Sequence, residues 1–254
     1  MSTALHCRCV GQGPDLVLLH GWGLHAGVWA GIEMQLAARF RLHLIDLPGH
    51  GLSAPPETFT LDSVCALLAR HVPARAHWLG WSLGGMLAME FAARQPQRAE
   101  RVILASSNPR FVATADWPQA MAAEVLEGFA RGLETDYAAT LTRFLSLVAR
   151  GSSDTGLLRQ LRRAVAEAPA PAPVALRGGL RILRDADLRP RLAEFAAPAL
   201  WIGGGRDTLV PIAALRRVQR EHPRMQLKEL SQAGHAPFIS HPQEFVAAVL
   251  EFLS

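Results

Sequence analysis

The sequence contains few cysteines, no long apolar run and no strong excess of either charge. Its three cysteines, Cys7, Cys9 and Cys65, are an odd number and are widely spread apart from the C-x-C pair at 7 and 9, so they predict neither a disulfide framework nor a four-ligand zinc site. No apolar run reaches the roughly 18 residues that a membrane span needs, and residues 1–10 lack a basic flank followed by a long apolar stretch. We therefore expect a cytoplasmic protein with reduced thiols and no membrane contact.

Several ligand-binding signatures are also missing. The glycines at 203–205 complete neither of two phosphate-binding patterns, G-x-G-x-x-G and G-x-x-x-x-G-K-[ST]. The metal-binding pattern H-E-x-x-H is absent, and His235 and His241 do not have a helical ligand spacing. We expect no cofactor, no metal and no nucleic-acid partner. The net charge of +4 is modest and suits an acidic partner without demanding one.

Short apolar runs and helical patterns alternate along most of the chain. The runs lack a period of two, as buried parallel strands do, and occur at 16–19, 42–45, 77–79, 102–105, 199–202 and 226–230. Helical patterns lie between them, near 26–38, 61–71, 83–95, 211–222 and 242–253. Pro211 and Pro242 stand at plausible first turns of the last two. This alternation predicts a doubly wound, mostly parallel α/β sheet.

The alternation breaks in the middle of the chain. Between about Phe111 and Asp185 helical patterns follow one another with no convincing strand, and a Pro-Ala run from Pro169 to Pro173 separates them. We interpret residues 111–185 as an inserted helical cap, or lid. Residues 1–110 and 186–254 then form the core domain.

The stretch Gly80-Trp81-Ser82-Leu83-Gly84 lies between a predicted strand and a predicted helix. That context is the one in which a G-x-S-x-G nucleophile elbow occurs, because the turn projects the serine Oγ above the sheet. Small residues are needed beside the serine so that strand and helix can approach closely, and Gly80 and Gly84 meet that need. Ser82 is the predicted nucleophile.

A serine needs a base to take its proton and an acid to orient that base. Asp207 follows the predicted strand 199–202 through a glycine turn, and His235 follows the strand 226–230, so both fall at strand ends in the expected order Ser, Asp, His. His241, beside Pro242, is a rival base with a simpler role at a helix start. Asp46 lies in a turn-rich segment, 46–53, which more simply shapes a loop beside the site.

The developing oxyanion needs hydrogen-bond donors. Leu83 follows the nucleophile at a helix start, where the helix dipole also favours negative charge. Trp22 lies in His20-Gly21-Trp22-Gly23, directly after a predicted strand. We expect the backbone amides of Leu83 and Trp22 to form the oxyanion hole.

Together these motifs resemble the α/β-hydrolase superfamily over essentially the whole chain. The chain is most similar to the carboxylesterases that act on pimeloyl-acyl-carrier-protein methyl ester in biotin synthesis. The segments that carry the closer resemblance are His20-Gly21-Trp22-Gly23, Gly80-Trp81-Ser82-Leu83-Gly84-Gly85, Arg143-Phe144-Leu145-Ser146-Leu147, Gly178-Gly179-Leu180-Arg181-Ile182-Leu183 and His235-Ala236-Pro237-Phe238-Ile239-Ser240-His241-Pro242.

The resemblance implies a substrate and its contacts. The esterases of this family remove a methyl ester from a pimeloyl chain on its carrier protein, releasing methanol. By resemblance, Trp22, Ser82, Leu83 and His235 contact the ester. An acyl channel is lined by Phe144, Leu145, Ser146, Leu147 and Val148, although the apolar members of that set also fit ordinary core packing.

Arginines are concentrated in the predicted cap. From residue 143 to residue 184 the chain carries eight arginines against two acidic residues, a local balance of +6. Carrier proteins are acidic, and such a surface steers acidic partners, although a solvated helical face has the same pattern. The candidate docking residues are Arg143, Arg150, Arg159, Arg162 and Arg163, on an enzyme that we expect to be a monomer.

Other functions share this triad. A general short-chain carboxylesterase, a carbon–carbon bond hydrolase, a lactone-opening enzyme, an acyl transferase and a related lyase remain alternatives. Epoxide hydrolases and dehalogenases carry Asp where this chain has Ser82. A small-ligand receptor on the same fold is the alternative outside enzymes.

Overall fold

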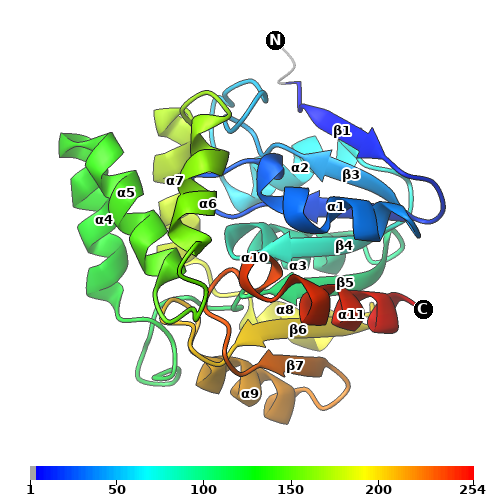
Figure 1. Ribbon diagram of the computed structural model, residues 1–254. Helices are drawn as coiled ribbons and strands as arrows, with labels where there is room; N and C mark the ends of the chain where they lie inside the picture. The colour runs from blue at the N-terminus through cyan, green and yellow to red at the C-terminus, as the bar shows by residue number, and fades with distance from the viewer. Residues whose placement is uncertain (1–3) are drawn as a thin grey trace.

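The structure is a computed structural model that describes residues 4–254. Residues 1–3, which belong to the predicted core segment and to the N-terminal stretch considered above, lie outside the described residues. Figure 1 shows a sheet with helices on both faces and a group of helices at one end of it. The predicted doubly wound, mostly parallel α/β sheet is confirmed.

The sheet has seven strands in the order β1-β3-β2-β4-β5-β6-β7. Their bounds are β1 Cys7–Val10, β2 Asp15–Leu19, β3 Arg41–Ile45, β4 Ala76–Trp81, β5 Ala99–Ala105, β6 Ala199–Gly204 and β7 Gln226–Leu230. All neighbours pair in parallel except β1, which pairs with β3 in antiparallel register. The sequence reasoning missed β1, because this edge strand is largely exposed and forms no apolar run.

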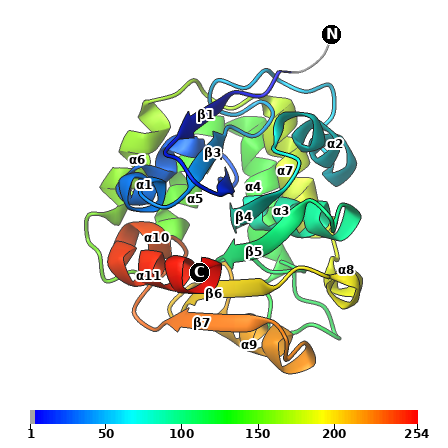
Figure 2. The same cartoon turned by 90° about the vertical axis from the view of Figure 1, so that its right-hand side faces the viewer.

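The helices cover both faces of the sheet. Their bounds are η1 Ala26–Trp29, α1 Ala30–Ala37, α2 Leu61–His71, α3 Leu83–Arg94, α4 Ala123–Thr135, α5 Tyr137–Ala149, α6 Leu157–Ala166, α7 Pro173–Asp185, α8 Arg189–Glu194, α9 Ile212–Glu221, α10 Pro237–Ser240 and α11 Pro242–Leu253. Helices α1 and α11 lie on one face, and α2, α3 and α8 lie on the other (Figure 2). Among residues 4–254 no helix has the length and apolarity that a membrane crossing requires.

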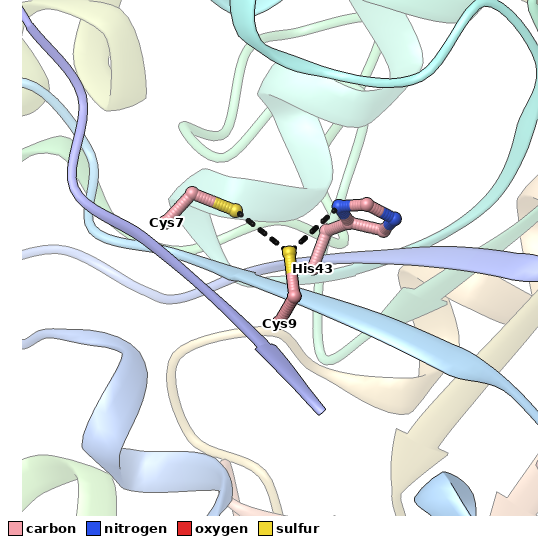
Figure 3. Close-up of side chains that lie close together, drawn as sticks. All are labelled: Cys7, Cys9 and His43. Atoms are coloured by element: carbon pink, nitrogen blue, oxygen red, sulfur yellow. Dashed lines mark hydrogen bonds between the residues drawn. The ribbon is translucent and has the colours of Figure 1, made fainter. Parts of the chain in front are cut away.

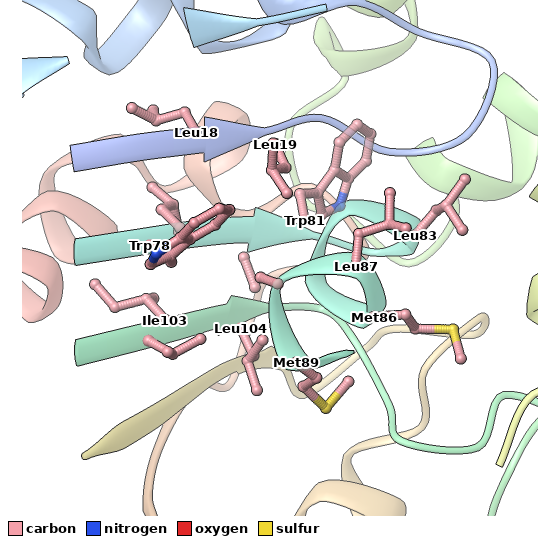
Figure 4. Packing of buried hydrophobic residues seen from close by; sticks show 14 of the residues in the cluster. Leu18, Leu19, Trp78, Trp81, Leu83, Met86, Leu87, Met89, Ile103 and Leu104 are labelled. Carbon is pink, nitrogen blue, oxygen red and sulfur yellow. The ribbon is translucent and has the colours of Figure 1, made fainter. Parts of the chain in front are cut away.

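Strand β4 and most of α3 are buried in the core. Trp78 and Trp81 of β4 are fully buried and lie beside side chains of β2, β5 and α3 (Figure 4). The ring centroid of Trp78 lies 4.2 Å from that of Phe91 in α3, so α3 packs directly against β4, the strand that precedes it. Burial of each such side chain contributes about 1.5–3 kcal/mol. The junction between β4 and α3, where Ser82 sits, is therefore held on a rigid support.

The inserted segment lies between β5 and β6. Helices α4 to α7 lie beyond the ends of the parallel strands toward which their arrows point (Figure 1), whereas α8 packs against α3. The indole of Trp117 helps fix this insertion, since the guanidinium groups of Arg189 and Arg217 stack on it at 5.2 and 4.5 Å from the ring centroid. The exact cap boundaries, 111–185, stay a prediction.

Candidate active site

The backbone at Ser82 has an unusual conformation. Its φ of 56° and ψ of −117° make it one of two non-glycine residues with positive φ among residues 4–254. Such a conformation costs about 1–3 kcal/mol and persists only where the surroundings enforce it. A Cβ on Gly80 would lie 2.4 Å from the carbonyl oxygen of Gly84, and one on Gly84 would lie 2.3 Å from that of Leu19. The glycines therefore permit the close approach that the turn requires.

Three side chains from distant parts of the sequence meet at this turn. His235 Nε2 lies 3.0 Å from Ser82 Oγ, and His235 Nδ1 lies 2.8 Å from Asp207 Oδ2. The other carboxylate oxygen of Asp207 accepts hydrogen bonds from the amides of Leu209 and Val210, at 2.8 and 2.9 Å. An ionised Asp207 can only accept, so Nδ1 of His235 carries the proton and Nε2 is free to take one from Ser82. All three side chains are buried.

The loop that carries His235 is anchored to the elbow itself. The indole Nε1 of Trp81 donates a 2.8 Å hydrogen bond to the backbone carbonyl of His235. Trp81 thus connects the strand before the nucleophile to the loop of the base. The rival His241 lies at the start of α11, where its Nδ1 is 2.9 Å from Ser240 Oγ, and it is not part of this arrangement.

The amides of Leu83 and Trp22 are available as donors. Neither donates to another backbone group among the described residues, and Leu83 opens α3, where the helix dipole favours negative charge. The side chain of Trp22 is held by the cap. Its Nε1 donates a 2.9 Å hydrogen bond to the carbonyl of Leu176 in α7, and its ring lies 4.9 Å from that of Phe144 in α5.

Two buried histidines lie next to the Trp22 loop. His20 Nε2 accepts a hydrogen bond from the amide of Leu47 at 2.9 Å, and its Nδ1 lies 2.8 Å from the carbonyl of Gly21, to which it donates. Burial lowers the pKa of His20 to about 3, and that of His50, whose ring centroid is 5.3 Å away, to about 4. Both imidazoles are therefore neutral, and they brace the loop rather than carry charge.

Asp46 also has a structural role. Its carboxylate accepts hydrogen bonds from the amides of Ala26 and Leu52, at 2.8 and 2.9 Å. Burial opposes ionisation, but these amide hydrogen bonds hold the pKa of Asp46 below its ordinary value. Asp46 thus fixes the segment 46–53 beside the site, as the turn pattern indicated, and does not contact Ser82 or His235.

A small apolar cavity of about 10 Å³ lies over Ser82 and His235. Its other walls come from the start of the insertion, from α4, α5 and α7, and from the loop after Asp207, namely Phe111, Met121, Leu126, Phe129, Phe144, Leu180, Leu183 and Leu209. Of these, only Phe144 was predicted to line an acyl channel, since apolar residues of separate helices carry no local signal of a shared wall.

The rest of the predicted acyl-channel segment lies elsewhere. Leu145 and Val148 are buried but do not line this cavity, and Leu147 is half-buried. Ser146 is exposed, and its hydroxyl donates to the carbonyl of Thr142 within α5. A helix presents only part of its circumference to one neighbour, so five consecutive residues cannot all face the same cavity.

The predicted docking arginines are all exposed. Arg143 lies on α5, Arg150 follows that helix directly, and Arg159, Arg162 and Arg163 lie on α6. Helices α5 and α6 pack side by side (Figure 1). Arg163 pairs with Glu167 at 2.9 Å, and the guanidinium of Arg143 lies 5.9 Å from the centroid of the Phe129 ring. The structure leaves these cationic groups at the surface of the cap.

The chain is similar to known proteins over most of its length. The family model described as alpha/beta hydrolase fold matches residues 14–242. The chain is 42% identical to a pimeloyl-[acyl-carrier protein] methyl ester esterase of Nitrosomonas europaea over 96% of this chain and 98% of that protein. It is 46% identical to the protein of the same description in Aeromonas salmonicida, over 96% of each chain. An esterase from Exiguobacterium antarcticum has the same fold, with a TM-score of 0.89 at 19% identity over 98% of this chain and 95% of that one.

Proposed function

The chain belongs to the α/β-hydrolase family and, within it, to the pimeloyl-[acyl-carrier protein] methyl ester esterases, and from this premise we propose that it hydrolyses the methyl ester of a pimeloyl chain held on an acyl carrier protein. The products are methanol and the carrier-bound acid, in the synthesis of biotin. The observation that carries the proposal is the hydrogen-bonded chain from Ser82 through His235 to Asp207 under an apolar cap.

The catalytic cycle follows from the hydrogen bonds. His235 Nε2 takes the Ser82 proton while Oγ attacks the ester carbonyl, and the Asp207 carboxylate stabilises the imidazolium. The amides of Leu83 and Trp22 stabilise the oxyanion. Methanol leaves with the proton from His235, and water activated by the same residue then hydrolyses the acyl-enzyme, which regenerates Ser82. No further group is needed.

The apolar wall favours an ester over the acid that it yields. A methyl ester is neutral, whereas the product is a carboxylate, and burial of an unpaired ion is far more costly than burial of a neutral ester. Apart from Ser82 and His235, the lining of the cavity is wholly apolar. The same wall that accepts the substrate therefore expels the charged product.

The carrier protein is proposed to dock on the cap arginines. Arg143, Arg150, Arg159, Arg162 and Arg163 are exposed and complement an acidic partner. A groove of about 220 Å³ lies between α4 and α7, and its charged lining residues are Arg177, Arg181, Arg184 and Glu134. It adjoins the catalytic cavity, since Leu126 and Leu180 contribute to the walls of both. The proposal includes a monomeric, cytoplasmic enzyme.

The test compares kcat/KM for methyl pimeloyl-carrier protein with that for a short-chain nitrophenyl ester, with Ser82→Ala as the blank. A strong preference for the carrier substrate is expected. Activity on the small ester alone would instead favour a general carboxylesterase or a hydrolase of free metabolites. A single burst without turnover on either ester would favour the ligand receptor.

Charge reversal tests the docking surface separately. Replacing Arg159, Arg162 and Arg163 together with Glu should raise KM for the carrier substrate, increasingly so at low salt, and leave the small ester unaffected. The matched control replaces Arg39, Arg70 and Arg220 with Glu. These arginines are exposed and precede β3, β4 and β7, so they lie near the ends of the strands opposite to the cap. Equal effects on both esters, or in both triple variants, would contradict docking at α6.

A further inference from the structure

Two cysteines and a histidine meet on the edge of the sheet, away from the catalytic groups. Cys9 of β1 stands opposite His43 of β3 in the antiparallel register, and Cys7 lies two residues earlier on the same side of β1. Cys9 Sγ is 4.0 Å from Cys7 Sγ and 3.4 Å from His43 Nδ1 (Figure 3). The three donor atoms all lie within 4.8 Å of one another.

The two distances from Cys9 Sγ, to Cys7 Sγ and to His43 Nδ1, are close to those of a tetrahedral metal site. With Zn–S of about 2.3 Å and Zn–N of about 2.0–2.1 Å, tetrahedral angles place two sulfurs about 3.8 Å apart and a sulfur and a nitrogen about 3.6 Å apart. The 4.0 and 3.4 Å separations differ from these by about 0.2 Å, which small side-chain rotations supply. A disulfide is less suitable, because cysteines two apart on a strand have Cα atoms about 6.6 Å apart, near the upper limit for that bond.

The second nitrogen of His43 is already oriented. Its Nε2 lies 2.6 Å from Asp15 Oδ1, and an ionised carboxylate can only accept, so Nε2 donates and Nδ1 presents its lone pair to the sulfur of Cys9. A carboxylate that holds the outer nitrogen of a ligating histidine is the usual support of protein zinc sites. His43 is buried and Cys9 is exposed, so a rigid ligand faces a side open to solvent.

The local charge also suits a divalent ion. Arg41 Nε lies 4.0 Å from Asp15 Oδ1. Once the ion has displaced both thiol protons, two thiolates, one carboxylate and one guanidinium carry a combined charge of −2. We propose that Cys7, Cys9 and His43 bind a zinc ion, with water as the fourth ligand. Both thiol protons are released to solvent on binding. The ion then links the edge strand β1 to β3 and hinders the exposed edge of the sheet from pairing with a strand of another chain.

Cobalt is a spectroscopic probe for this site. The whole chain, reduced and freed of metal by chelation under anaerobic conditions, is titrated with Co²⁺ and then with Zn²⁺. We expect one Co²⁺ per chain, with a thiolate-to-cobalt charge-transfer band and the ligand-field bands of a tetrahedral site, both removed by Zn²⁺. Cys65→Ala, which alters a buried thiol outside the cluster, should bind as the native chain does.

Variants separate the ligands from their support. Cys9→Ser and His43→Ala should abolish the saturable bands, whereas Asp15→Asn should keep them and weaken the affinity about 10–100-fold. Thermal unfolding in chelator establishes that each variant folds, and Zn²⁺ should raise the Tm of the native chain but not of Cys9→Ser. The proposal is overturned if the native chain shows no saturable thiolate band, or if Cys9→Ser binds equally well.

Discussion

Gly179→Ala should damage the site although the residue carries no chemistry. An alanine Cβ at this position in α7 would lie 2.6 Å from Trp22 Cδ1 and 3.0 Å from Leu83 Cδ2. The first distance is about 0.8 Å short of an ordinary contact of 3.4 Å. Trp22 cannot easily yield, because its Nε1 is bonded to Leu176 and its ring packs on Phe144.

The cost has two parts. Overpacking of this kind typically destabilises a protein by about 1–3 kcal/mol. The strain also falls on the two residues whose amides are proposed to hold the oxyanion, and a misplacement approaching 1 Å at a reacting centre can lower a rate about 10²-fold. We therefore expect kcat on a small ester to fall by about one to two orders of magnitude, within the range for loss of an oxyanion donor.

The matched control is Gly31→Ala. Gly31 is exposed in α1, and a Cβ there would meet nothing within 4 Å. It should stabilise the protein by about 0.5–1 kcal/mol, since alanine is the better helix former, and leave kcat unchanged. Urea unfolding and steady-state kinetics measure both effects. If Gly179→Ala proves as stable and as active as Gly31→Ala, the cap is not packed against the oxyanion loop in the way described.

Two further predictions concern the triad and acid stability. Asp207→Asn should lower kcat by about 10⁴-fold, because the amide favours the wrong tautomer of His235, and a loss below tenfold in the purified variant would exclude the orienting role. The folded-state pKa values of His20 and His50 are about 3 and about 4, against an ordinary value of 6.5. As the pH falls below 6.5, these histidines therefore take up protons in the unfolded chain while they stay neutral in the folded chain. Below pH 6, each of the two histidines should therefore lower the free energy of unfolding by up to about 1.4 kcal/mol per pH unit. Urea midpoints at pH 7, 6 and 5 measure this slope, and an unchanged slope in His50→Gln would contradict it.

The cap in this structure is closed over the nucleophile. Ser82 is 3% exposed and His235 is 1% exposed, and the cavity above them has no room for an acyl chain. Substrate entry therefore requires movement of the helices that form its wall. The hydrogen bond from Trp22 to Leu176 joins the oxyanion loop to α7, so opening of the cap on this side would also disturb the groups that stabilise the oxyanion.

The sequence predicted what local pattern and chain order determine. Ser82, Asp207 and His235 stand at the ends of β4, β6 and β7, and parallel strands bring such ends to one edge. The residues that line the cavity could not be predicted from local pattern, because they come together only when separate helices pack. Phe129 and Leu180 share a cavity wall only because α4 and α7 pack together.

The cluster on the sheet edge illustrates the same limit. A C-x-C pair alone offers too few ligands, so the cysteines predicted no four-ligand zinc site, and the histidine spacing predicted no metal. His43 is brought beside Cys9 by the pairing of β1, a strand that was not predicted, with β3. Ligands contributed by different strands become visible only once the register is known.

The most direct test of the central claim is hydrolysis of methyl pimeloyl-carrier protein in water enriched in ¹⁸O. Attack of Ser82 on the acyl carbon predicts that the heavy oxygen enters the pimeloyl carboxylate, that methanol carries none, and that Ser82→Ala releases neither product. Heavy oxygen in the methanol, or hydrolysis that survives in Ser82→Ala, would contradict the account.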